Sequence, residues 1–151
     1  MVYPVYTNVF EIGTAGRTGT SSDMKAIADI ETFSPAFEST TQEWTPMDLE
    51  GWSRSAVSGK KFSIELSGKR SYGDDGNDYL AGMANKIGQD CETTFKWTMP
   101  NGAVLSFDCV CDVTEIGGGD STNMDSLKAK IICDGKPTYT APSSSNGGGS
   151  V

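Results

Sequence analysis

The stretch from residue 51 to residue 137 constrains the fold of this chain more than any other part of the sequence. Apolar and polar residues alternate with a period of two in several of its segments, which is typical of half-buried β-strands. Only one short segment between them has the spacing of an amphipathic helix. We therefore expect a mainly β domain in which one helix packs on antiparallel strands.

Four alternating strands are predicted in this stretch. Asn101-Gly102, a strong hairpin signal, joins the second strand to the third. Apolar and cysteine side chains share one face of each strand, whereas Lys128 and Lys130 lie on the polar face of the last. The predicted strands are residues 60–68, 91–99, 103–113 and 127–133. A further strand, at an edge of the sheet, is expected within residues 2–12.

The predicted helix lies between the first two of these strands. Asn77 is the expected N-cap, and Gly88 is the expected C-terminal stop of a helix of about three turns. Its apolar stripe consists of Leu80, Met83, Ala84 and Ile87.

Residues 24–50 are predicted to form a long hairpin. Its expected arms are residues 24–33 and 41–49, and Pro35 marks a turn over residues 34–40. The first arm is apolar on both alternation phases, which favours a strand covered on both faces, here by a neighbouring subunit. The interface residues that we expect are Ile27, Ile30, Phe33, Trp44, Met47 and Leu49.

The negative charge of the chain is concentrated in the same segment. Residues 23–50 contain seven acidic residues and one basic residue, so they hold −6 of the total charge of −8. Tight binding of nucleic acid needs clustered Lys and Arg, and the sequence shows no such cluster. The acidic segment either keeps the surface soluble or repels a polyanion.

Neither a metal site nor a cofactor is expected. The chain has one C-x-C pair and no histidine, which argues against a zinc site. All four cysteines fall on the apolar phase of predicted strands, so buried free thiols are expected. They are Cys91, Cys109, Cys111 and Cys133. Residues 74–78 look like a calcium loop but lack the EF-hand register and its closing Glu, and a helix cap explains them.

The sequence does not predict an enzyme. Residues 51–55 do not match G-x-S-x-G, and without histidine there is no conventional Ser-His-Asp triad. A small hydrolase would need two carboxylates at working distance, which no motif marks. An alternative is a monomeric β-sandwich that binds carbohydrate or a cell surface through Trp44, Trp52 and Trp97. Against this, Trp97 falls on the inward phase of its strand and Trp44 suits an interface.

As an ordered set, these segments resemble the major tail protein (tail tube protein) family of tailed bacteriophages, most of all that of long-tailed phages. The resemblance covers about residues 20–137, from the acidic hairpin through the helix to the last strand. It rests on GWSRSAVSGKKFSIELSGKRSYGDDGNDYL, TTFKWTMPNGAVLSFDCVCDV and GGGDSTNMDSLKAKIICDGKP. It implies an antiparallel β-sandwich or half-barrel with one flanking α-helix and a long β-hairpin. We expect a single tail-tube-like domain over residues 1–140 and a flexible Gly/Ser-rich tail over residues 141–151.

The resemblance also implies a function. It predicts a structural virion protein that self-assembles as stacked hexameric rings into the phage tail tube, a channel for DNA delivery. The implied partners are other copies of the chain, the tape measure protein, tail-end proteins and DNA that transits the lumen without specific binding, with no membrane. Assembly is implied in the host bacterial cytoplasm, and the virion tail is the final location.

Inside such a tube, the acidic segment would face DNA. Six copies of a segment carrying −6 would place about −36 on each ring, which would repel phosphate. The expected lumen-facing acids are Asp29, Glu31, Glu43 and Asp48. Residues 1–22, the turn near Pro35 and residues 117–124 are the expected contacts between rings.

Overall fold

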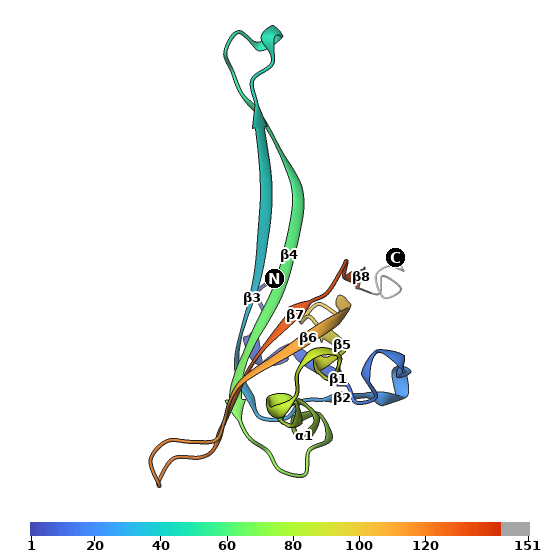
Figure 1. The fold of residues 1–151 in the computed structure, drawn as a ribbon, viewed down its shortest axis with the longest axis vertical. Coiled ribbons are helices and arrows are strands. Elements are labelled where there is room, and N and C mark those ends of the chain that lie inside the picture. Colours follow the sequence, from blue (N-terminus) through green and yellow to red (C-terminus); the bar gives the residue numbers. More distant parts are fainter. Residues whose placement is uncertain (143–151) are drawn as a thin grey trace.

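The computed structural model describes residues 1–142, which form one curved antiparallel sheet, a short helix and a long projecting hairpin (Figure 1). The strands are β1 (Val9–Gly13), β2 (Met24–Ala26), β3 (Ile30–Trp44), β4 (Arg54–Lys69), β5 (Glu92–Thr98), β6 (Val104–Ile116), β7 (Ser126–Cys133) and β8 (Thr138–Thr140). The helix is α1 (Asp75–Gly82). Short 3-10 helices are η1 (Val5–Thr7), η2 (Gly16–Thr18), η3 (Ser21–Asp23), η4 (Met47–Leu49), η5 (Met83–Asn85) and η6 (Gly88–Cys91). Of the tail predicted over residues 141–151, residues 143–151 lie outside the described residues.

The strands follow the order β2-β1-β5-β6-β7-β4-β3, and β8 pairs with the start of β6. The four alternating strands of the sequence are confirmed as β4, β5, β6 and β7. Their inward phase is buried, for example at Ile64, Phe95 and Ile131. The strand expected within residues 2–12 is β1, but it pairs with both β2 and β5 and is therefore not an edge strand.

The sheet curls around its own core. Phe10 of β1 and Phe33 of β3 come from strands near opposite ends of the sheet, yet their ring centroids are 4.8 Å apart. Phe62 of β4 lies 5.4 Å from Phe107 and 6.3 Å from Trp97, measured between ring centroids. This closure buries the apolar phase of the strands on one side only, as in the predicted half-barrel.

The helix begins earlier than predicted. Asp74 is the N-cap, since its side chain accepts a hydrogen bond from the Asn77 amide at 3.0 Å, so the expectation of Asn77 as the cap is wrong. Leu80 and Met83 face the core as predicted. Ile87 lies beyond the end of the helix and is exposed, because a 3-10 turn follows α1 directly.

The hairpin is also displaced from its predicted position. Residues 34–40 are not a turn, because β3 runs straight through them and Pro35 pairs opposite Ile64 of β4. Proline is tolerated here because β3 is an edge strand of the sheet. Residues 24–26 form the short β2 at the other end of the sheet, so the two arms are β3 and β4 and the tip is residues 45–53.

The cysteines lie where the alternation places them. Cys91, Cys109 and Cys111 are buried, Cys133 is half-buried, and all four are free thiols. The Sγ atoms of Cys109 and Cys111 are 3.8 Å apart. This contact, together with burial, raises the pKa of the Cys109 thiol, and burial raises the pKa of Cys91 and of Cys133. These thiols therefore behave as small core side chains.

Candidate assembly interface

The β3–β4 hairpin extends far beyond the sheet that carries it (Figure 1). β4 pairs with β7 only between Ser63 and Lys69, whereas β3 and β4 pair with each other as far as Trp44 and Arg54. Residues 37–44 and 54–62 thus form a two-stranded overhang of roughly 30 Å at about 3.3 Å per residue. We call these residues the hairpin overhang.

Both backbone edges of the hairpin overhang are free of strand partners within residues 1–142. A two-stranded hairpin is marginally stable in water, and natural proteins usually cover or pair exposed strand edges. A third strand supplied by a partner would therefore stabilise the overhang more than any other part of the described chain.

Large apolar side chains are exposed along the hairpin overhang and its tip. Phe37 on β3 and Val57 on β4 are each 56% exposed, although both residue types are favoured in half-buried strands. At the tip, Met47 is fully exposed and Trp52 is 77% exposed. Such a concentration of exposed apolar groups is typical of surfaces that another protein covers.

The structure divides the six expected interface residues into two groups. Ile27 is buried in the core, and Ile30 and Phe33 pack against it at the base of the hairpin. Trp44, Met47 and Leu49 lie together at the other end, at or next to the tip, and are exposed. The sequence did not predict Phe37 or Val57 as interface residues, and it indicated Trp52 only for the carbohydrate-binding alternative. The period of two through Phe33, Pro35 and Phe37 was the signal for a continuous strand.

The four acids expected in the lumen also fall at two ends of β3. Asp29 and Glu31 lie in or beside the β2–β3 turn, whereas Glu43 and Asp48 lie at or near the tip. The 12 residues from Glu31 to Glu43 span roughly 40 Å along an extended strand. These acids therefore cannot form a single cluster within one copy.

Basic residues of β4 oppose the acidic residues of β3. Lys69 forms an ion pair with Glu31 at 2.9 Å, and Lys61 is the cross-strand partner of Glu38. Residues 30–69 contain six acidic and four basic residues, so the whole hairpin carries only −2. The charge count for residues 23–50 alone missed this balance, because the basic partners belong to the other arm.

The polar face of the neighbouring strands also alternates in charge. Lys130 of β7 lies between Glu65 of β4 and Asp112 of β6 in the strand register, and all three side chains are exposed. Lys128 lies between Ser67 and Glu115 in the next row. The outer face of this sheet is thus strongly hydrated and only mildly acidic.

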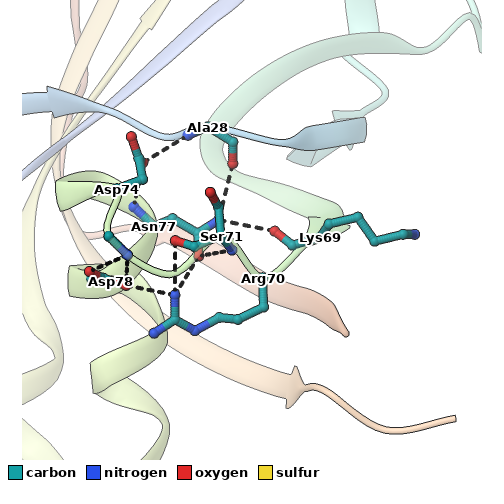
Figure 2. A network of polar contacts seen from close by, with 8 residues as sticks. Ala28, Lys69, Arg70, Ser71, Asp74, Asn77 and Asp78 are labelled. Atoms are coloured by element: carbon teal, nitrogen blue, oxygen red, sulfur yellow. Dashed lines mark hydrogen bonds and ion pairs between the residues drawn. The ribbon is translucent and has the colours of Figure 1, made fainter. Parts of the chain in front are cut away.

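A buried amide joins the base of the hairpin to helix α1 (Figure 2). The Nδ2 atom of Asn77 donates to the carbonyl oxygens of Ala28 and Lys69, each at 3.0 Å. Its Oδ1 atom accepts from Arg70 Nη1 at 2.9 Å and from the Ser71 amide at 3.0 Å. Asn77 is completely buried, so it holds the β2–β3 turn, the end of β4 and the helix in one arrangement.

Two carboxylates complete this network. Asp74 accepts from the amide of Ala28 at 3.1 Å, and Asp78 accepts from Arg70 Nη1 at 2.7 Å. Arg70 also lies over the ring of Tyr72, 4.2 Å from its centroid. A side chain at Gly76 would collide with the Ala26 carbonyl, so only glycine allows the helix to approach β2 this closely. These contacts hold the base of the hairpin against helix α1.

Within residues 1–142, no group of three or more His, Cys, Asp or Glu side chains is placed to hold a metal ion. Within residues 74–78, the Asp74 carboxylate caps the helix and the Asp78 carboxylate accepts from Arg70. Trp97 belongs to the core, whereas Trp44 and Trp52 lie at the hairpin tip, so the three tryptophans do not form one platform. None of the helices in the described part of the chain is long and apolar enough to cross a membrane.

Solved structures with the same fold come from tails and tube assemblies. A chain from the tail of an empty gene transfer agent particle, solved with C6 symmetry, aligns with a TM-score of 0.72 and 16% identity over 93% of this chain and 100% of its own length. A chain from the virion of a native gene transfer agent aligns with a TM-score of 0.66 and 15% identity, with coverage of 93% and 100%. A chain from the sheath/tube terminator of an extracellular contractile injection system (PVC) aligns with a TM-score of 0.64 and 14% identity, with coverage of 93% and 98%.

No family model and no curated protein sequence matches the chain. The likeness to these tail and tube assemblies is therefore a likeness of fold alone, and this fold agrees with the one that the sequence segments predicted.

Proposed function

We propose that this chain is a structural subunit that assembles with copies of itself into the tube of a phage-like tail. The hairpin overhang carries this proposal, because its free edges and exposed Phe37 and Val57 need a partner that the described chain does not supply. Strand pairing and apolar burial between copies would satisfy both needs. The fold shared with tail components supports the same role.

The finer arrangement is part of the same proposal. Six subunits form a ring, rings stack into a hollow tube, and DNA passes through the lumen without specific binding. The contact between copies is head-to-tail, since the two free edges of the sheet, β2 and β3, differ from each other. Tape measure and tail-end proteins are the further partners, assembly takes place in the bacterial cytoplasm, and the virion tail is the final location. This role requires neither catalysis nor a cofactor.

The polar face of β3, β4, β7 and β6 is the surface that we assign to the lumen. Its rows of alternating charge, such as Glu65, Lys130 and Asp112, offer no apolar or basic surface to which DNA would adhere. Asp29, Glu31, Glu43 and Asp48 add negative charge at the two ends of the hairpin in this proposal. Of the six expected interface residues, Trp44, Met47 and Leu49 are the ones exposed for contact with another copy.

Electron microscopy of the concentrated, purified chain tests this function. Hollow filaments or rings with six-fold symmetry are expected, together with an average mass by light scattering that rises with concentration. A monomer that persists across concentration and salt would contradict the proposal. Binding of a glycan array by that monomer would favour the alternative of a carbohydrate-binding module.

A further inference from the structure

The aromatic core of the subunit continues onto the hairpin, where its last side chain, Phe37, is exposed to solvent. Phe62 is buried and stacks on Phe37, with 4.5 Å between ring centroids. Phe33, four residues before Phe37, has Phe10 and Trp97 opposite it, whereas Phe62 is the single aromatic partner of Phe37 in the described part of the chain. Strands on the opposite side of the half-barrel therefore cover Phe33, whereas Phe37 packs only on the neighbouring strand β4 and is open on its other side.

The same face continues toward the tip. Thr41 lies two alternation steps beyond Phe37, and Val57 is its cross-strand partner on β4. The row between Phe37 and Thr41 on this face is polar, because Ser39 pairs with Lys60, whose Nζ donates to Ser39 Oγ at 3.2 Å. Phe37, Thr41 and Val57 are all exposed, and we call these three residues the open patch. A segment that covers the open patch has to be apolar and extended, because the patch is a narrow strip along two strands.

The N-terminal segment, residues 1–6, is apolar, and residues 1–4 lie outside any helix, whereas Val5 and Tyr6 belong to the 3-10 helix η1. It contains no charged side chain, and Val2, Val5 and Tyr6 are largely exposed, Val2 to 95%. Pro4 is extended, with φ of −65° and ψ of 149°, and it has no amide hydrogen, so it suits a strand added at an edge. In one copy this segment and the open patch are both exposed, so they do not cover each other.

We propose that residues 1–6 of one copy cover the open patch of a second copy. Residues 1–4 add an apolar third strand along one free edge of the hairpin overhang, and Val5 and Tyr6 of η1 extend the apolar cover over the open patch. The two surfaces differ, so the contact can repeat from copy to copy around a closed assembly. This inference rests on the proposed tube, and it names the contact through which neighbouring subunits depend on each other.

Cysteine cross-linking between separately prepared variants tests this contact. Val2→Cys and Val57→Cys subunits are mixed, assembled and oxidised with copper phenanthroline. A disulfide-linked dimer is expected in the mixture but with neither variant alone, which distinguishes a second copy from contact within one chain. Val2→Cys mixed with Tyr139→Cys is the matched control, since Tyr139 is as exposed as Val57. If Val57→Cys fails to fold, Thr41→Cys replaces it.

Removal of residues 1–6 provides a second readout. It should raise the critical concentration for assembly by about tenfold or more, because the deletion leaves Phe37 and Val57 of the partner in water. Assemblies that form without the Val2–Val57 cross-link, or an unchanged critical concentration after the deletion, would overturn this inference and leave the tube standing. A wild-type chain that never assembles would instead overturn the proposed function.

Discussion

The Asn77→Ala substitution should destabilise the free subunit strongly, because one buried side chain joins three segments. Asn77 is completely buried and makes four hydrogen bonds, to Ala28, Lys69, Arg70 and Ser71. Alanine would leave two carbonyl oxygens and one amide facing a cavity. These segments carry the hairpin, so the substitution tests how the fold positions its proposed interface.

The size of the effect follows from these contacts. A buried polar group that loses its partner costs about 1–3 kcal/mol, and three groups lose theirs here. Water entering the cavity recovers part of this loss. We expect the free energy of unfolding to fall by about 3–5 kcal/mol, which lowers Tm by roughly 10–15 °C for a domain of this size.

Urea and thermal unfolding followed by circular dichroism measure this change. Asn85→Ala is the control, since Asn85 has the same side chain but is exposed in η5, and its substitution should change stability by less than about 0.5 kcal/mol. A loss below about 1 kcal/mol for Asn77→Ala would refute the reasoning, because the network would then contribute little to holding the hairpin base.

Three further changes test other parts of the structure. Trp52→Ser should weaken assembly while leaving the Tm of the monomer almost unchanged, because Trp52 is exposed at the tip; a large fall in monomer Tm would contradict this. A double-mutant cycle of Glu31→Ala and Lys69→Ala should give a coupling energy below about 1 kcal/mol that decreases with added salt, because both side chains are substantially exposed. A larger coupling energy that does not depend on salt would show that this ion pair stabilises the fold. The free energy of unfolding should fall as pH rises above the ordinary thiol pKa of 9.0, because only the unfolded chain then ionises: in the folded state burial raises the pKa of Cys91, and the contact with Cys111 together with burial raises the pKa of Cys109. The slope of this fall should lessen in Cys109→Ala. An identical slope in both proteins would show that another group is responsible.

Alternation predicted the parts of the fold that are buried within one chain. β5 and β6 face a continuous core, so their inward residues, such as Phe95 and Phe107, are apolar apart from the buried Thr93. The helix was found for the same reason, although its start was misplaced. Asp74 and Asn77 are both good capping residues, and only the tertiary contacts of Asn77 decide between them.

The hairpin was misplaced because its outer part has no core of its own. Residues 34–44 are exposed, so burial within the subunit imposes no alternation there, and Pro35 resembled a turn signal. The charge reasoning failed for a related reason. Lys61 and Lys69 neutralise β3 from the opposite strand, and this pairing becomes visible only once the register is known. Sequence patterns report local burial, whereas strand order and cross-strand partners depend on the whole fold.

Hydrogen exchange of the hairpin overhang tests the central claim most directly. Amides of residues 37–44 and 54–62 are compared in the free subunit and in the assembled state by mass spectrometry, with the β5–β6 amides as an internal reference. Pairing between copies predicts that exchange of the overhang slows by about a hundredfold or more on assembly while the reference changes little. Equal exchange of the overhang in both states would show that no second copy completes this hairpin.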